Sequence, residues 1–386
     1  MRLASLSRWL SSAVHAWKHL QVSYYGGKYS VERLLALDEY TRNTPLSRVL
    51  LVCIGTPVPM AVLVSAQALL SLQEPADGWR ANSGFWIRSG ILSFTVAVIL
   101  TTQAIYHIDG VTTSTLQVLL LSALTSLLFT IGALAISAAL IFPVPFFVLT
   151  LCPIFYVALI TSYRIVLGDA IFRQMLQNRD QTVRYIYFVG ARNVMVFTYP
   201  AYETLFRAVR GSAYQLPVIL ILPFIKVAIR NLVLRCMTHL EDMMPEAVIF
   251  TRPVILREAL EALFTTECIV VTAYLEAIIP FFYCSYMLVS SRYHTEMVGV
   301  TSGNVVKTIL PVFNFGILQL ATFLVLAAVI KRNCGMKMLY QLAFVLETHM
   351  PLIQGKFMFW VLIVLCFRIV HFGVDFSFQF KKGFYS

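Results

Sequence analysis

Charged side chains inside hydrophobic segments are the residues of this sequence best suited to chemistry. Glu276 lies near the centre of an apolar stretch from about Cys268 to Val289. A charge at mid-bilayer costs about 2.5–3.5 kcal/mol on insertion scales, so an intramembrane carboxylate is a candidate functional group by default. Glu276 could carry a proton or bind a cation. The alternative is a buried Glu276 that pairs with a neighbouring helix and serves packing only.

A second pair of candidates carries positive charge. Lys226 and Arg230 lie one helical turn apart in the hydrophobic segment 216–234. Two cations on one helical face could line a pathway or bind an anionic lipid headgroup. The alternative is that both long side chains reach back to the cytoplasmic interface of the membrane.

A third group lies near the end of the chain. Arg368, His371 and Asp375 recur at i, i+3 and i+7, which places them on one face of a last span predicted from about Phe357 to Val374. There they could pair with Glu276 across the bundle. The alternative is that this span ends early and the three side chains lie among the headgroups.

The sequence contains none of the common enzyme motifs that would support catalysis. The sequence has no P-loop, Gly-x-Ser-x-Gly, His-Glu-x-x-His or dinucleotide fingerprint. His239, Glu241, Asp242 and Glu246 match no metal-ligand spacing, and the seven cysteines form no Cys-x-x-Cys. We therefore predict no catalytic residue, no metal and no cofactor, and we leave open whether the protein is an enzyme.

The composition indicates that lipid surrounds most of these helices. Of the 386 residues, 59% are hydrophobic and 13% are charged, whereas soluble domains are about 25% charged. The mean hydropathy is +0.76. The net charge of +11 does not indicate nucleic-acid binding, because the basic residues are spread over segment ends. They are typical of the cytoplasmic ends of membrane helices, with the bilayer and its anionic headgroups as partners.

Hydrophobic runs predict an all-α, polytopic transmembrane bundle. The predicted spans are 49–70, 91–107, 116–142, 147–167, 268–289, 309–330 and 357–374. The segments 185–208 and 216–234 carry charges and could form an in-plane, re-entrant or spanning pair. The predicted regions are a basic cytoplasmic segment 1–48, a four-span block 49–167, a polar, partly amphipathic cytoplasmic region 168–266, a three-span block 267–376 and a tail 377–386.

The distribution of Lys and Arg predicts the orientation. With a cytoplasmic N-terminus, regions 168–266 and 331–356 fall inside and hold most of the non-terminal Lys and Arg. The ambiguous pair must then contribute zero or two crossings, so seven or nine spans are consistent. The predicted location is the plasma membrane or an endomembrane. A basic, acid-free N-terminus leaves a mitochondrial membrane as the alternative.

Four stretches resemble a large family of uncharacterised multi-pass membrane proteins from oomycetes. They are Ser30-Val-Glu-Arg-Leu-Leu-Ala-Leu-Asp-Glu-Tyr40, Tyr199-Pro-Ala-Tyr202, Leu216-Pro-Val-Ile with Pro223-Phe-Ile-Lys226, and Leu240-Glu-Asp-Met-Met-Pro-Glu-Ala-Val-Ile-Phe-Thr251. The resemblance covers roughly residues 30 to 266. It implies membership of a membrane family and assigns no activity and no site residue.

Two functional hypotheses follow. The first is passage or binding of a small solute or ion within the bundle, favoured by proline-interrupted spans and the intramembrane charges. The second is a sensor or scaffold that does not transport and acts through the cytoplasmic face of 168–266. The sequence identifies no solute and no protein partner.

Overall fold

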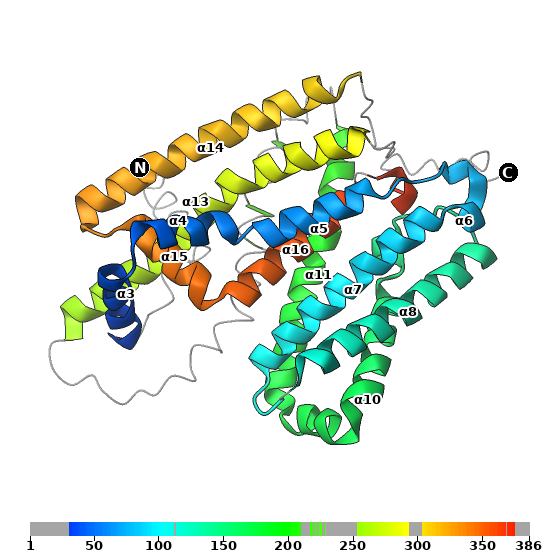
Figure 1. The fold of residues 1–386 in the computed structure, drawn as a ribbon, viewed down its shortest axis with the longest axis horizontal. Helices are drawn as coiled ribbons and strands as arrows, with labels where there is room; N and C mark the ends of the chain where they lie inside the picture. Colours follow the sequence, from blue (N-terminus) through cyan, green and yellow to red (C-terminus); the bar gives the residue numbers. More distant parts are fainter. Residues whose placement is uncertain are drawn as a thin grey trace, which may run out of the picture. The chain divides into compact units, whose positions relative to one another are not determined.

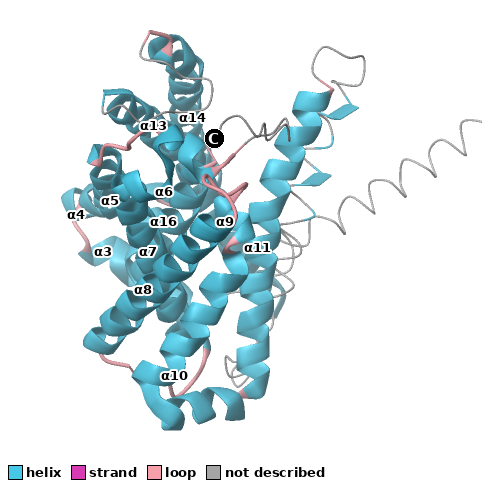
Figure 2. Ribbon diagram, turned by 90° about the vertical axis from the view of Figure 1, so that its right-hand side faces the viewer, coloured by secondary structure: helices cyan, strands magenta, loops and turns pink. Residues whose placement is uncertain are grey.

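The computed structural model is mostly helical in the residues that it describes. The described residues are 31–111, 113–209, 253–292, 303–367 and 369–374, with isolated positions between 217 and 228. Figure 2 shows helices joined by loops in these ranges, with no strand among them. The predicted all-α helical bundle is therefore confirmed.

Two compact units make up the chain. The first joins Met1–Asn43 to Ile186–Thr272, and the second joins Thr44–Tyr185 to Ala273–Ser386. The boundary between Tyr185 and Ile186 falls inside helix α11 (Arg179–Ala208). The boundary between Thr272 and Ala273 falls inside helix α13 (Pro253–Arg292).

Prolines divide the first helix of the second unit. Helix α4 (Leu46–Gly55) and helix α5 (Val58–Leu69) are separated at Thr56 and Pro57, and together they form one candidate span. Pro57 and Pro59 lack the N–H that would continue the helical ladder, which explains the predicted interruption of this span.

Three further helices of the second unit pack side by side (Figure 1). They are α7 (Ser83–His107), α8 (Thr115–Ala139) and α10 (Cys152–Gln177), and α8 packs against both of the others. Small and hydroxyl residues allow close approach in a lipid-type interface. Ser126 Oγ donates to the Gly90 carbonyl at 2.7 Å, and Tyr163 Oη donates to Thr101 Oγ1 at 3.1 Å.

The ends of these helices follow from local chemistry. Ser114 begins α8 with a capping box, in which its hydroxyl accepts from the Gln117 N–H and the Gln117 side chain accepts from the Ser114 N–H. Helix α10 bends at Gly168, whose φ of 74° belongs to the left-handed region that glycine tolerates. In the sequence, a polar stretch begins at Asp169, directly after this bend.

The C-terminal spans differ from the prediction. Helix α14 (Val305–Cys334) is a single long helix, but α15 (Met338–Thr348) and α16 (Met350–Cys366) meet at a bend of 88°. The predicted last span from Phe357 to Val374 is wrong at both ends, because the helix starts at Met350 and stops at Cys366. Pro351 occupies the first turn of α16, where a missing N–H costs nothing.

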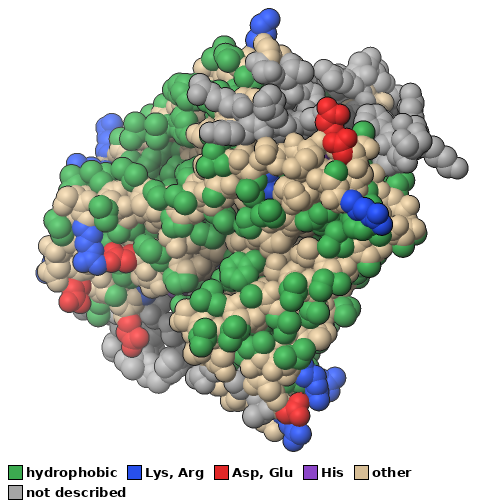
Figure 3. All heavy atoms as spheres, turned by 45° about the vertical axis from the view of Figure 1, so that its right-hand side comes forward, with side chains coloured by type: hydrophobic (Ala, Val, Ile, Leu, Met, Phe, Trp, Pro, Cys, Tyr) green, Lys and Arg blue, Asp and Glu red, His purple; other side chains and the backbone are tan. Residues whose placement is uncertain are grey.

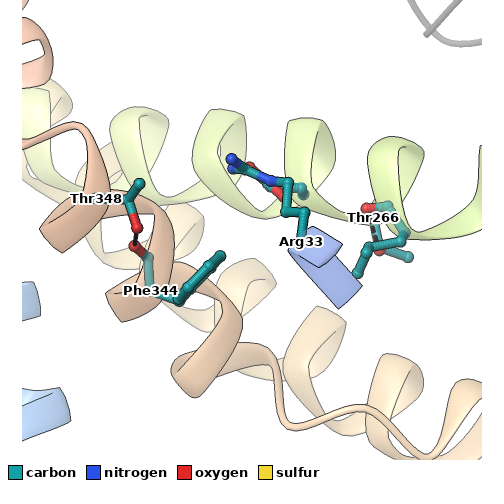
Figure 4. Close-up of polar contacts among 6 residues, drawn as sticks. Arg33, Thr266, Phe344 and Thr348 are labelled. Carbon is teal, nitrogen blue, oxygen red and sulfur yellow. Dashed lines mark hydrogen bonds and ion pairs between the residues drawn. The ribbon is translucent and has the colours of Figure 1, made fainter. Parts of the chain in front are cut away.

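Within the first unit, α3 (Val31–Asn43) contacts α13 through a charged pair. Arg33 Nη2 lies 2.5 Å from Glu267 Oε1, and the two side chains are 19% and 7% exposed. Figure 4 shows Arg33 extending toward α13, where Thr266 Oγ1 donates to the Leu263 carbonyl at 2.9 Å. The same view includes the Thr348 hydroxyl of the second unit on the Phe344 carbonyl at 2.7 Å.

Six described helices are long and apolar enough to cross a membrane, or up to seven if α15 and α16 form one span. The predicted number of seven to nine spans agrees with this count only if α15 and α16 form one span, which gives seven. Helix α11 is absent from the six, which fits the charges predicted to disfavour 185–208 as a simple span. Hydrophobic side chains cover much of the face in Figure 3, with few charged ones. Such helices and surfaces are those of a membrane protein.

Candidate solute site at two interrupted helices

The interruption between α4 and α5 leaves a main-chain acceptor without its helical donor. Cys53 O would normally accept from the N–H four residues later, but that residue is Pro57. The Tyr274 hydroxyl of α13 donates to Cys53 O instead. Tyr274 is 4% exposed, so its hydroxyl satisfies a carbonyl that no water reaches.

The bent helix pair α15–α16 meets the first span at its break. Gln354 Nε2, in the α16 segment just after the 88° bend, donates to the Thr56 carbonyl at 3.2 Å. Thr56 is 1% exposed, and its own hydroxyl donates to Val52 O at 2.7 Å. Helix α15 packs on α4 and α16 packs on α5, so the two breaks lie side by side.

These two breaks place backbone carbonyls that helical N–H groups do not pair inside the bundle, where side chains take that role. Irregular backbone at membrane depth is tolerated only where protein buries it or where it lines a water-filled cavity. Interrupted helices place carbonyls and N–H groups at mid-membrane, where secondary transporters bind solutes and coupling ions. In the second unit, the contact between Thr56 and Gln354 joins the two interruptions.

A second polar cluster stabilises the far end of α5. Arg88 of α7 is 3% exposed, and its Nη2 donates to the carbonyls of Ala68 and Leu70, the former at 3.3 Å. These are among the last carbonyls of α5, which the helix itself leaves without donors. We therefore assign Arg88 a structural role in ending α5.

His371 belongs to the same end of the second unit. It lies in the short turn η3 (Val370–Phe372), where its Nε2 donates to the Gln73 carbonyl at 2.6 Å. Its ring stacks on Phe85 with centroids 6.1 Å apart. Burial lowers the pKa of His371 below its ordinary value; the bond to Gln73 O opposes this, and the nearby Arg88 charge adds to the lowering. The neutral imidazole of His371 thus links the turn η3 to the loop that contains Gln73.

An aromatic cluster surrounds that bond. Phe85 contacts Trp86, Phe142, Phe147 and Phe372 in edge-to-face or tilted pairs with centroids 5.1 to 5.5 Å apart. The first turn of α7, the segment between α8 and α10, and the turn η3 after α16 all contribute rings to it. The turn η1 (Pro75–Asp77) and the short helix α6 (Gly78–Ala81) lie between α5 and α7, and the short helix α9 (Phe147–Thr150) lies between α8 and α10.

The structure describes two of the six predicted site residues. Glu276 is exposed on α13, and no hydrogen bond or ion pair joins it to any residue in the described part of the chain. His371 is buried in η3, and it does not continue the α16 helix as predicted. Because α16 ends at Cys366, His371 does not lie on a helical face of that span, in line with the alternative that the span ends early. The remaining four lie outside the described residues: Lys226, Arg230, Arg368 and Asp375.

Sequence reasoning missed the residues that join the two breaks. Thr56, Gln354 and Tyr274 are ordinary polar or aromatic residues in apolar runs, and nothing in their spacing pairs them. The available signal was proline: Pro57 and Pro351 mark the two interruptions, and a polar residue lies within three positions of each. Arg88 lies before the predicted span 91–107, and the structure places it within α7.

Comparisons with known proteins add no assignment. No family model, no curated protein and no solved structure matches this chain. The resemblance to oomycete membrane proteins therefore stays a prediction.

Proposed function

We propose that this is a multi-pass integral membrane protein that binds and passes a small polar solute or ion where its two interrupted spans meet. One observation carries the proposal: the amide of Gln354 reaches the Thr56 carbonyl, so the break in α4–α5 lies against the break in α15–α16. The proposal includes a cytoplasmic N-terminus, as the distribution of Lys and Arg favours.

The energetics support a ligand site at this point. A continuous helix satisfies its own backbone, so an interruption in a membrane costs several kcal/mol unless new partners form. Tyr274 and Gln354 each supply one such partner. The Gln354 bond is the weaker, at 3.2 Å between two uncharged groups. A solute that offers a better donor to Thr56 O, or a better acceptor to Gln354 Nε2, can replace it.

Cysteine accessibility tests this function before the solute is known. A protein with its native cysteines replaced receives Gln354→Cys or, as a matched control, Leu318→Cys. Leu318 is 68% exposed on α14, a candidate span. Both variants are reconstituted in liposomes and treated with a membrane-impermeant methanethiosulfonate. A cysteine thiolate attacks the reagent, forms a mixed disulfide and releases methanesulfinate, and thiolates form in water and not in hydrocarbon.

The expected result is a reaction at position 354 at least tenfold faster than at position 318. Pools of free amino acids, hexoses, nucleosides and inorganic salts are then added in turn, and one pool should slow the reaction at 354. A thiol at 354 that reacts no faster than one at 318, or that reacts and is protected by none of the pools, would reject the proposed function.

A further inference from the structure

Helix α14 presents two opposite faces along its candidate span. The inner face carries buried residues that recur every seven positions: Ile309, Gly316, Phe323 and Ile330. An added Cβ at Gly316 would lie 3.0 Å from the Cβ atom of Pro280 on α13. The ring of Phe323 lies 6.5 Å from that of Tyr274, also on α13. The inner face therefore packs α14 against α13, which runs beside it in Figure 1.

The outer face of α14 carries exposed residues spaced four, three and four positions apart, here called the outer seam: Asn314, Leu318, Ala321 and Val325. Each lies two positions from Gly316 or Phe323, which is about 200° around a helix. Steps of three and four residues are those of a coiled-coil seam, along which two helices pack. Only 17% of the α14 span is buried, the lowest share among the candidate spans of the described residues. The outer seam is therefore open to a further helix.

Asn314 places an amide in the outer seam within the hydrocarbon layer. The charged residues at the two ends of the same face are Lys307 and Arg332. They are about 37 Å apart along the axis, farther than the hydrocarbon thickness of about 30 Å. Asn314 lies about 10 Å inward from Lys307, so hydrocarbon surrounds it while both cations reach the headgroups. An amide in hydrocarbon is costly unless it forms a hydrogen bond, and no described residue forms one with Asn314.

A second copy of this chain supplies a matching amide. Copies inserted in one membrane share an orientation, so a symmetric pair is related by an axis along the membrane normal. Two α14 helices that meet across that axis are parallel, and each position of the outer seam then faces the same position of the partner subunit. Asparagine suits such a place because its carboxamide carries both donors and an acceptor. A charged residue there would meet its own charge.

We propose that the outer seam is a homodimer interface in the membrane, in which the amide of Asn314 bonds to Asn314 of the partner subunit. Packing and interhelical hydrogen bonds drive the association of helices in lipid, and one asparagine in a seam fixes the register of the pair. Like charges at Lys307 and Arg332 repel between copies only at the headgroups, where salt screens them. The interface is independent of the solute site at Thr56 and Gln354, which lies on other helices.

Cysteine cross-linking tests the seam in the full-length protein, reconstituted in liposomes at a low ratio of protein to lipid. Its native cysteines are replaced, and it carries Val325→Cys or, as a matched control, Leu324→Cys. The two positions are 63% and 60% exposed and adjacent in depth, but they are about 100° apart around the helix. A disulfide needs Cα atoms within about 7 Å of one another. With copper phenanthroline as oxidant, Val325→Cys should form a covalent dimer at least about tenfold faster than Leu324→Cys. Equal rates, or a faster reaction at 324, would overturn the proposed seam.

Substitution of Asn314 tests the amide itself. Energy transfer between donor-labelled and acceptor-labelled copies, followed over a series of ratios of protein to lipid, gives the dissociation constant of the dimer. Asn314→Leu should raise that constant about threefold to twentyfold, the range of interhelical hydrogen bonds in membranes. Asn314→Gln keeps the donors and the acceptor and should restore most of the affinity. Thr322→Val is the control, because the Thr322 hydroxyl already donates to the Leu318 carbonyl of its own helix at 2.9 Å; it should leave the constant unchanged.

Two outcomes would overturn the dimer interface: a native protein that stays monomeric at every ratio, or an equal effect of Asn314→Leu and Thr322→Val. Position 354 is probed in separate variants, so the dimer interface and the proposed function can each fail alone.

Discussion

The Tyr274 hydroxyl donates to the Cys53 carbonyl, the acceptor that Pro57 deprives of its helical donor. A residue on α13 thus completes a hydrogen-bond ladder on α4, more than 200 positions away in the sequence. The bond explains how the interrupted helix keeps a partner for a carbonyl on a residue that is only 7% exposed. It also ties α13 to the interrupted span on which the proposed site depends.

Removing that hydroxyl should destabilise the protein. Tyr274→Phe leaves Cys53 O buried without a donor, which costs about 1–3 kcal/mol. Unfolding in detergent micelles measures the loss. Tyr283→Phe on the same helix, where the tyrosine is only partly buried, is the control and should change stability by about 0.5 kcal/mol or less. Equal losses in the two variants would show that the bond to Cys53 contributes nothing specific.

A close backbone approach makes Gly84 intolerant of a methyl group. A Cβ at Gly84 would lie 2.3 Å from the Ser71 carbonyl oxygen, so Gly84→Ala must move the backbone and should cost about 1–3 kcal/mol. Gly190 of α11 is the matched control, because nothing lies within 4 Å of its Cβ position. Gly190→Ala should be neutral or stabilise by up to about 1 kcal/mol. The unfolding midpoints of both variants check the prediction.

The Arg33–Glu267 pair should contribute to the stability of the first unit. Both side chains are largely buried, and Arg33→Ala withdraws a charged donor from the Glu267 carboxylate, at a cost of about 1.5–3 kcal/mol. The exposed pair Arg42–Asp38 is the control: its side chains are 76% and 53% exposed, and Arg42→Ala should cost under about 0.5 kcal/mol. Proteolysis of α3 near Tyr40 reports the loosening. If Arg42→Ala accelerated cleavage as much, the difference in burial would have no consequence.

His371 should make the protein less stable in acid. Burial holds its folded-state pKa below the unfolded value of about 6.5, so the unfolded chain binds the extra proton. Its contribution is therefore complete above pH 6.5 and declines as the pH falls below that value. His371→Gln, which can still donate to Gln73 O, should remove this part of the decline between pH 7.5 and 5. If the melting temperatures of the two proteins fell by the same amount between pH 7.5 and 5, the prediction would be contradicted.

Hydropathy and proline positions predicted most of the fold. The helices around 49–70, 91–107, 116–142 and 309–330 lie where apolar runs of spanning length predicted them, because a bilayer demands about 20 apolar residues in a helix. The interruption at Pro57 was predicted for the same kind of reason, since a residue without an N–H breaks the ladder wherever it occurs. These properties depend on neighbours in sequence alone.

The site required the tertiary structure. The sequence by itself determined that the helices are apolar, that α4–α5 is interrupted and that Glu276 lies within a span. Only the packing decided that α16 ends at Cys366, that Gln354 meets Thr56, and that Glu276 faces outward rather than toward a partner. A break in a helix leaves acceptors whose donors come from anywhere in the chain, and no local pattern encodes that choice.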